Sequence, residues 1–226
     1  IKAESQELES SISKNKKLLE KTEKKLKDIL LQIPNIPSSD SPVGEDETAN
    51  TVIKTWGSPV NSNIEHSSLL SNNGLLDFEL GASISKTRFV VMKNEIAKLH
   101  RALSTFMINI HTEKNGYIEY NVPLLVSSES LIGTGQLPKF EDDLFKIENN
   151  DLFLIPTAEV PLTNVYTGKI INESDLPIKM VAQTPCFRSE AGSYGKDTKG
   201  IIRQHQFEKV ELVHIIKPEN ADNALE

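Results

Sequence analysis

Two charged stretches in the last third of the chain hold the residues best suited to chemistry. The first ends in Phe-Arg-Ser-Glu at residues 187–190, and the second begins at Ile201, where apolar and β-branched residues favour a strand. Side chains two apart on a strand share a face, and four residues advance the chain by about 13 Å. We therefore expect Arg203, Phe207 and Glu211 to form one row on a hairpin strand.

These side chains suit attack on a nucleotide α-phosphate. Arg188 and Glu190 have the same parity, so both should project from one face of the preceding strand. A guanidinium matches phosphate oxygens with two parallel donors, which makes Arg188 the candidate for that contact. Phe207 can stack an adenine, Glu211 can accept from an ammonium or a hydroxyl, and the glycine-bearing loop 191–202 can bend over a ligand. A hairpin with a solvated charged face is the alternative, which this ordered series of residues disfavours.

The order of these residues resembles motif 2 of the class II aminoacyl-tRNA synthetases. The amino-acid sequence of residues 187–193 and 203–207 is similar to that of the seryl-tRNA synthetase family. Upstream, Gly-Thr-Gly-Gln-Leu-Pro-Lys-Phe at 133–140 and Ile-Pro-Thr-Ala-Glu-Val-Pro-Leu at 155–162 also resemble that family in sequence and spacing. The resemblance covers essentially the whole chain.

The resemblance implies roles for individual positions. Arg188 and Glu190 would be the catalytic pair, with Arg188 on the α-phosphate and the serine carboxylate and Glu190 on the adenine amino group. The residues that would bind ATP are Arg188, Ser189, Glu190, Arg203, Gln204 and Phe207. The residues that would bind serine are Thr157, Ala158, Glu159, Arg188 and Glu211. Within the serine set, Glu211 would receive the side-chain hydroxyl, and Thr157 and Glu159 the α-amino group. Taken alone, Thr-Ala-Glu fits a structural helix start equally well.

The reaction that the resemblance implies joins serine and ATP into seryl-adenylate and then transfers the seryl group to tRNA(Ser). ATP would come with Mg²⁺, whose main protein ligand we expect outside this chain, because motif 3 and the acidic residue before it are not found. We expect the 226 residues to be inactive alone. A related ligase that loads an amino acid onto a carrier-protein thiol remains an alternative. So does a non-catalytic coiled-coil or RNA-binding relative.

Composition is typical of an intracellular enzyme fragment, and we expect a cytoplasmic protein. The sequence has 38% hydrophobic residues, a net charge of -7, no apolar run of membrane-spanning length and no signal peptide. The single cysteine, Cys186, should fill the core as a small hydrophobe. We expect no metal site, because the five histidines are too scattered to suggest one; they stand at positions 66, 100, 111, 205 and 214.

The first 33 residues read as one long helix with an apolar heptad seam. The seam consists of Ile1, Leu8, Ile12, Leu19, Leu26, Ile29 and Ile33. Eight lysines against six acids make the segment mildly basic. A solvated coiled-coil face explains them on sequence alone, whereas the resemblance implies the second helix of an antiparallel tRNA-binding arm. The lysines that would contact tRNA are Lys14, Lys16, Lys17, Lys21, Lys24 and Lys25. The chain begins mid-seam, so we expect the partner helix to be missing.

The remaining organisation follows from breaks in composition. Residues 34–63 form a linker rich in proline, serine and acids, and residues 64–226 are the N-terminal part of a class II catalytic core. An amphipathic helix is expected over 86–112 and a strand over 117–122, a pair that resembles motif 1, through which the class forms homodimers. The predicted fold is α+β, with an antiparallel sheet of the class II synthetase type, flanking helices and a long helix in front.

Overall fold

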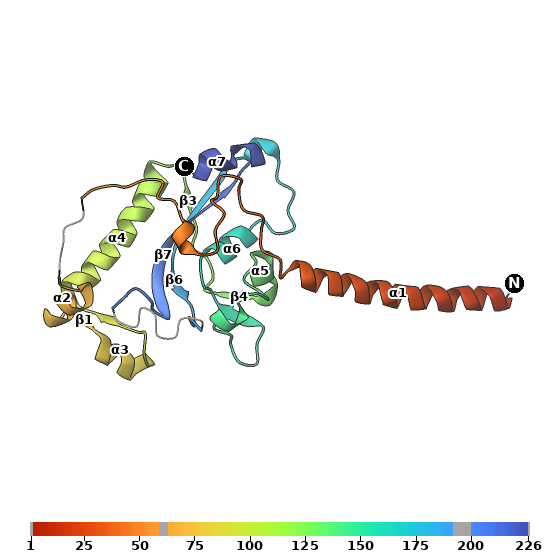
Figure 1. Ribbon diagram of the computed structural model, residues 1–226, viewed down its shortest axis with the longest axis horizontal. Helices are drawn as coiled ribbons and strands as arrows, with labels where there is room; N and C mark the ends of the chain where they lie inside the picture. Colours follow the sequence, from red (N-terminus) through yellow and green to blue (C-terminus); the bar gives the residue numbers. More distant parts are fainter. Residues whose placement is uncertain (1, 59–62, 192–199, 226) are drawn as a thin grey trace. The chain divides into compact units, whose positions relative to one another are not determined.

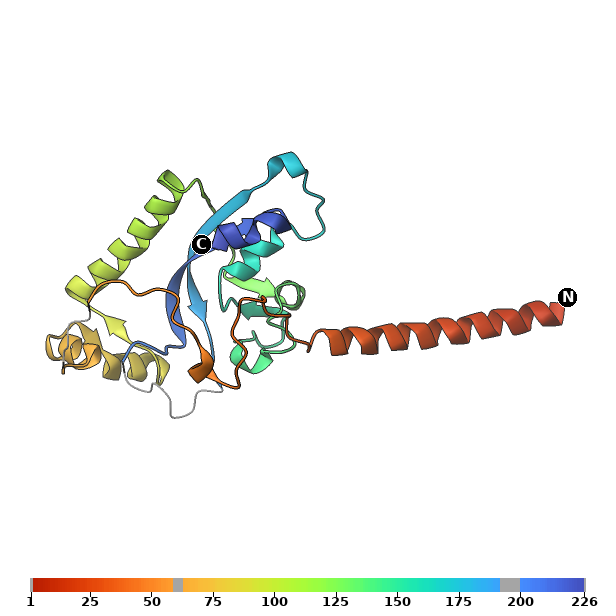
Figure 2. The same cartoon turned by 45° about the horizontal axis from the view of Figure 1, so that its top comes forward.

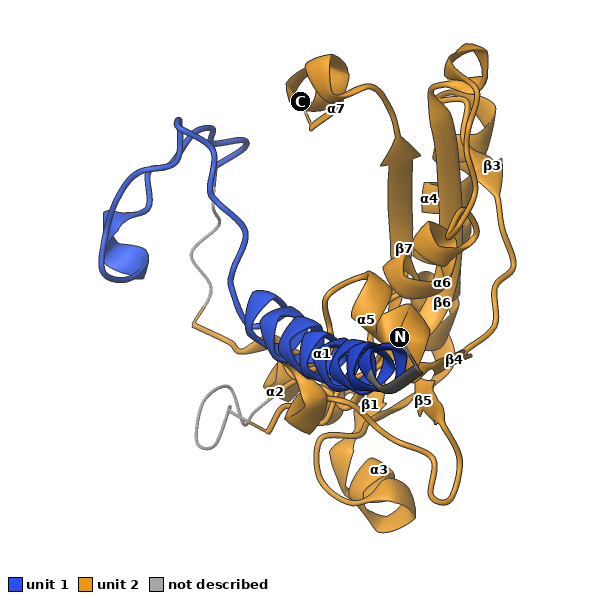
Figure 3. Cartoon of the chain, turned by 90° about the vertical axis from the view of Figure 1, so that its right-hand side faces the viewer, with its two compact units in different colours: residues 1–62 blue, residues 63–226 orange. Residues whose placement is uncertain are grey.

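The structure, a computed structural model, describes residues 2–58, 63–191 and 200–225. The chain divides into two compact units, residues 1–62 and residues 63–226 (Figure 3). Gly192 and Gly195, two of the glycines expected to bend the loop after the first hairpin strand, lie outside the described residues.

The first unit is dominated by one helix, α1, at Lys2–Leu30, followed by irregular chain and a single 3-10 turn, η1, at Glu47–Ala49 (Figure 1). The helix stops three residues before the Ile33 that we expected. Pro34 disfavours helical backbone at Ile33, and the chain passes instead through turns in which Gln32 and Ile33 donate to the carbonyls of Ile29 and Leu30. The described seam side chains are all more than half exposed, so the helix offers an apolar stripe along its length.

The second unit is built on a long antiparallel hairpin. Strands β6 (Ile178–Phe187) and β7 (Gln206–Ile215) pair over ten residues, from Ile178 opposite Ile215 to Phe187 opposite Gln206. A short strand, β3 (Ile118–Glu119), adds to β6 in parallel. The expected α+β fold is therefore confirmed, although the central sheet is mixed and not purely antiparallel.

Helices lie on both sides of this hairpin (Figure 1, Figure 2). On one side runs α4 (Asn94–Glu113), and on the other lies α6 (Glu159–Asn164). Met180 and Ala182 of β6 are fully buried in a cluster with Ala158 and Leu162, which holds the start of α6 against the strand. Cys186 is also fully buried, which confirms its expected place in the core.

Shorter elements surround this centre. The stretch before α4 contains α2 (His66–Asn72), β1 (Leu76–Asp77), α3 (Phe78–Ser85) and β2 (Val91–Met92). Between the sheet strands β3 and β6 the chain forms β4 (Leu125–Ser127), α5 (Ser128–Gly133), η2 (Glu141–Asp143), β5 (Leu152–Leu154) and η3 (Glu173–Asp175). After β7 come η4 (Pro218–Asn220) and α7 (Ala221–Leu225). None of the helices in the described ranges is long and apolar enough to cross a membrane.

Three expected boundaries in the second unit were wrong. The helix predicted from residue 86 begins at Asn94, because Lys86 and Arg88 have positive φ angles of 74° and 63° that an α-helix excludes. The strand predicted from Ile201 begins five residues later. The strand predicted over 117–122 is reduced to the two residues of β3.

Candidate active site

The Phe-Arg-Ser-Glu segment lies just beyond the end of β6, held by contacts other than strand pairing. The amide of Arg188 donates to the carbonyl of His205 at 3.0 Å, and Nδ1 of His205 lies 3.0 Å from the carbonyl of Arg188. The ring of His205 packs against those of Phe89 and Phe145, with centroids 5.4 and 5.9 Å away. His205 therefore fixes the position of the arginine backbone.

Arg188 and Glu190 do not share a strand face, contrary to expectation. The strand ends at Phe187, and Glu190 has a left-handed φ of 51°. Its carboxylate accepts a hydrogen bond from Arg203 at 2.9 Å, in an ion pair between two partly exposed side chains. Arg203 is likewise off its expected strand, so an ion pair across the loop, and not strand parity, brings it to Glu190.

The guanidinium of Arg188 lies over the ring of Phe207, with Cζ 5.2 Å from the ring centroid, in cation–π geometry. Its Nε donates weakly to the carbonyl of Pro156 at 3.4 Å. Pro156 immediately precedes the Thr-Ala-Glu stretch. Arg188, predicted to contact ATP, is thus held against the backbone at the start of the Thr-Ala-Glu stretch, which is predicted to contact serine.

A compact polar cluster joins that stretch to β7. The buried hydroxyl of Thr157 donates to Oε2 of Glu211 at 2.5 Å and accepts from Nζ of Lys209 at 2.8 Å and from the amide of Glu159 at 3.2 Å. Lys209 and Glu211 also form an ion pair. Every hydrogen-bonding capacity of the hydroxyl is used, so Thr157 is fixed between a cation and an anion.

Members of both groups line one cavity of about 390 Å³. Its lining consists of Gln136, Phe140, Asp143, Leu144, Pro156, Thr157, Glu159, Arg188, Glu190, Arg203 and Lys209. Five of the predicted ATP- and serine-binding residues are therefore brought together around one space.

The other predicted site residues do not line that cavity. Ala158 is fully buried, and Ser189 donates its hydroxyl to the carbonyl of Asp142. Phe207 lies under the guanidinium of Arg188, and Glu211 accepts from the hydroxyl of Thr157. Gln204 is nearly buried and lines a separate cavity of about 540 Å³ beside α2 and α3, with its amide donating to the carbonyls of Gly200 and Arg203.

Sequence reasoning missed three residues that shape this site: Lys209, His205 and Asp143. A signal existed for Lys209, which has the same parity on β7 as Phe207 and Glu211 and so had to share their face. Asp143 comes from a turn 45 residues before Arg188, and no local pattern points to it.

Local charges at the cavity are balanced: Arg188, Arg203 and Lys209 are cations, and Asp143, Glu159 and Glu190 are anions. Beside it, burial raises the pKa of the Cys186 thiol, so this cysteine stays protonated and inert. Among the described residues, no group of three or more histidine, cysteine, aspartate or glutamate side chains could hold a metal ion.

Comparisons with known proteins agree with this geometry. The model of the class II tRNA synthetase core domain (G, H, P, S and T) matches residues 140–226. A serine--tRNA ligase from Sulfurihydrogenibium sp. (strain YO3AOP1) is 55% identical over 207 residues, which are 90% of this chain and 50% of that protein.

Solved structures match as well. A seryl-tRNA synthetase from Pyrococcus horikoshii, complexed with ATP, superposes with a TM-score of 0.91 at 35% identity, covering 98% of this chain and 55% of that one. A cytoplasmic serine-tRNA ligase from Naegleria fowleri, in complex with AMP, gives a TM-score of 0.82 at 29% identity, covering 95% of this chain and 52% of the other. The RNA binding domain of a threonyl-tRNA synthetase from Cryptosporidium parvum Iowa II, at 18% identity and a TM-score of 0.61 over 72% of this chain and 39% of that one, shares the fold alone.

Hairpin, flanking helices and cavity together are those of a class II aminoacyl-tRNA synthetase core. Within that class, the chain belongs to the seryl-tRNA synthetase family. It spans about half the length of the curated relative and the solved seryl enzymes that it matches.

Proposed function

We propose that the protein carrying this chain is a serine–tRNA ligase, which activates serine with ATP to seryl-adenylate and transfers it to tRNA(Ser). The observation that carries the proposal is the single cavity lined by Arg188 and Glu190 on one side and by Thr157 and Glu159 on the other. An ATP site and an amino-acid site must share one space if a carboxylate is to attack the α-phosphate. The seryl relative from Pyrococcus horikoshii was solved complexed with ATP, which supports the nucleotide assignment.

On the nucleotide side, Arg188 would stabilise the negative charge that develops at the α-phosphate during the reaction. Its guanidinium, already oriented by Phe207 and Pro156, would hold the serine carboxylate and the α-phosphate together. Phe207 would stack the adenine on the ring face opposite Arg188, and Glu190 would accept from the adenine amino group. Arg203 lines the same cavity, whereas Ser189 and Gln204, also predicted for the nucleotide set, do not line it in this structure. Catalysis would come from positioning and electrostatics, without a protein nucleophile.

On the amino-acid side, the Thr157–Lys209–Glu211 cluster suits a small hydroxylated substrate. Glu211 would accept from the serine hydroxyl, and Thr157, Ala158 and Glu159 would surround the α-amino group. Lys209 offsets the charge of Glu211, so the cluster can take a neutral hydroxyl without leaving an isolated buried anion. A substrate lacking that hydroxyl makes one hydrogen bond fewer to Glu211.

The remaining partners are part of the same proposal. Residues 1–33 would be the second helix of an arm that binds tRNA through the lysines from Lys14 to Lys25, residues 34–63 a linker, and residues 64–226 part of the catalytic core. The exposed apolar side chains of α4, such as Leu103 and Phe106, support a homodimer through this helix. Mg²⁺ would accompany ATP, and no described residue is assigned to it. A cytoplasmic location is proposed because one solved relative is named a cytoplasmic ligase.

This proposal is tested by asking which molecule receives the activated serine. The full-length protein, given ATP and radiolabelled serine, is expected to charge tRNA(Ser) and to leave phosphopantetheinyl carrier protein unlabelled. Labelled carrier protein without labelled tRNA would replace the proposal with the carrier-loading alternative. No serine-dependent use of ATP at all would favour a non-catalytic relative.

A further inference from the structure

Asp143 accepts hydrogen bonds from the residues on both sides of Glu190, and these bonds are called the grip below. Its backbone carbonyl accepts from the amide of Ser189 at 2.9 Å, and its carboxylate accepts from the amide of Ala191 at 2.9 Å. Ser189 also donates its hydroxyl to the neighbouring carbonyl, that of Asp142. Three hydrogen bonds therefore run from the two residues flanking Glu190 to one turn.

Glu190 requires such support because of its backbone conformation. Its φ of 51° lies in the left-handed region, which side-chain-bearing residues other than asparagine and aspartate rarely occupy. Pairing with β7 ends at Phe187, so Glu190 lies beyond the strand ladder. A strained conformation persists only where surrounding contacts over-determine it.

The turn that carries Asp143 is itself anchored in the core. The amide of Asp143 donates to the carbonyl of Phe140 at 3.0 Å, and the amide of Leu144 donates to that of Glu141 at 3.1 Å. Leu144 is buried in a cluster with Phe153 and Ile155. Asp143 therefore projects its short carboxylate from a fixed platform toward the end of β6.

We propose that Asp143 is a positioning residue that aims the Glu190 carboxylate into the cavity. It acts by fixing the peptide units on either side of Glu190, and Arg203 then pairs with a carboxylate that already points the right way. This inference rests on the proposed function, because Glu190 is the residue assigned to the adenine. Loss of the grip is expected to weaken ATP binding and to leave the serine pocket, built from Thr157 and β7, unchanged.

Three variants of the full-length protein separate positioning from general structure. Asp143→Ala removes the acceptor for Ala191, and Asp143→Asn keeps an acceptor oxygen in nearly the same place. Asp142→Ala is the matched control, since among the described residues Asp142 holds Ser189 through its backbone carbonyl. In serine-dependent ATP–pyrophosphate exchange, we expect Asp143→Ala to raise the KM for ATP about tenfold, the effect of losing one charge-assisted hydrogen bond, and to change the KM for serine less than twofold. Asp143→Asn should recover most of the loss, and the control should match wild type.

Hydrogen exchange at the amide of Ala191, followed by mass spectrometry of peptides covering 187–191, measures the grip without reference to activity. Exchange should accelerate in Asp143→Ala and stay slow in Asp143→Asn. Unchanged exchange in the alanine variant, equal rises in both KM values, or an asparagine variant as poor as the alanine one would each overturn the proposal. If wild type shows no ATP-dependent activity, the proposed function fails together with the nucleotide role of Asp143, and the exchange rates still decide whether the grip exists.

Discussion

Replacing Thr157 by valine tests the polar cluster with the smallest change in shape. The hydroxyl donates to Glu211 at 2.5 Å and accepts from Lys209 at 2.8 Å and from the amide of Glu159 at 3.2 Å, and valine keeps nearly the same volume while removing all three bonds. A hydrogen bond to a charged group contributes about 1.5–3 kcal/mol. Because Lys209 and Glu211 stay paired and are partly exposed, we expect a loss equal to about one such bond.

Because the hydroxyl also fixes Glu211, the proposed acceptor of the serine hydroxyl, its removal should weaken one charged hydrogen bond to the substrate and lower kcat/KM for serine by up to about 100-fold, or about 2.7 kcal/mol, measured by ATP–pyrophosphate exchange in the full-length protein. The free energy of unfolding in urea should fall by about 1–2 kcal/mol. Thr157→Ser is the matched control, because it keeps the hydroxyl and should retain most of the activity. The reasoning is refuted if the valine variant stays within threefold of wild type, or if the serine variant is equally impaired.

Three further predictions concern selectivity, the first unit and pH. Glu211→Ala should raise the KM for serine and shrink the serine-over-alanine preference in pyrophosphate exchange by about tenfold or more, because the hydroxyl acceptor is lost; an unchanged preference would move that contact elsewhere. Deleting residues 1–33 should leave serine-dependent exchange largely intact while severely impairing tRNA charging, and charge reversal within 14–27 should weaken tRNA binding and flatten its salt dependence; charging that survives the deletion would make the helix a plain association element. Burial, reinforced by Lys179, lowers the pKa of His214, so the folded state binds its proton less tightly than the unfolded one, and stability should be lost as pH falls below about 6.5. His214→Gln should reduce that loss when urea unfolding is compared at pH 7.5 and 5.5, and an equal loss in both proteins would contradict the assignment.

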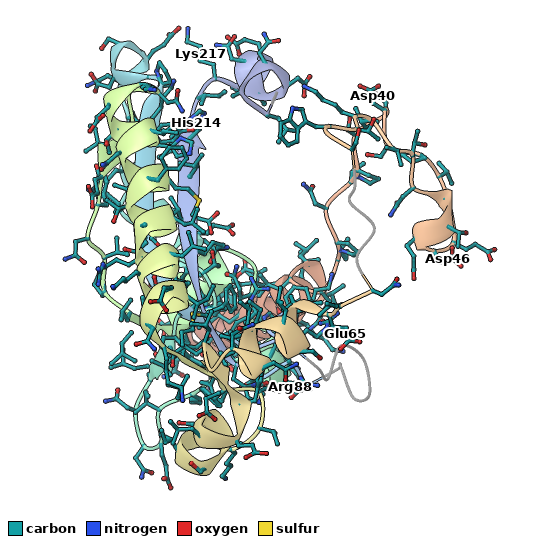
Figure 4. All side chains as sticks on the ribbon, turned by 90° about the vertical axis from the view of Figure 1, so that its left-hand side faces the viewer. Asp40, Asp46, Glu65, Arg88, His214 and Lys217 are labelled. Carbon is teal, nitrogen blue, oxygen red and sulfur yellow. The ribbon has the colours of Figure 1, made fainter. Side chains whose placement is uncertain are left out.

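The position of His214 makes this last test independent of the active site. Figure 4 shows His214 and Arg88 at opposite ends of the second unit. Near the end of β7 the His214 ring packs on Tyr117, with centroids 5.0 Å apart. Arg88 lies at the other end, where it donates to the carbonyl of Glu190. A change at His214 should therefore alter stability with little effect on the KM for ATP.

Much of the architecture could be predicted because it follows from local patterns. Apolar and β-branched residues after Ile201 indicated β7, and the heptad indicated α1, since each depends on residues close in sequence. Strand parity could also have placed Lys209 with Phe207 and Glu211, because the three residues are two apart.

What the sequence did not predict depends on contacts between distant segments. The apolar pair Ile201 and Ile202 favours a strand, yet the amide of Ile201 donates to His66, so pairing starts only at Gln206. Glu190 adopts a left-handed conformation because a turn 47 residues earlier holds its neighbours. Such long-range hydrogen bonds leave no periodic trace in a single sequence.

The most direct test of the central claim is serine-dependent ATP–pyrophosphate exchange by the full-length protein and its Arg188→Lys variant. One ammonium cannot reproduce the two-pronged grip of a guanidinium on a carboxylate and a phosphate, and it lacks the planar fit over the Phe207 ring. We predict exchange with serine in wild type and a rate lower by roughly 100-fold or more in the variant, with unchanged folding by circular dichroism. Near-normal exchange in the Arg188→Lys protein would contradict the proposed role of this arginine and, with it, the mechanism.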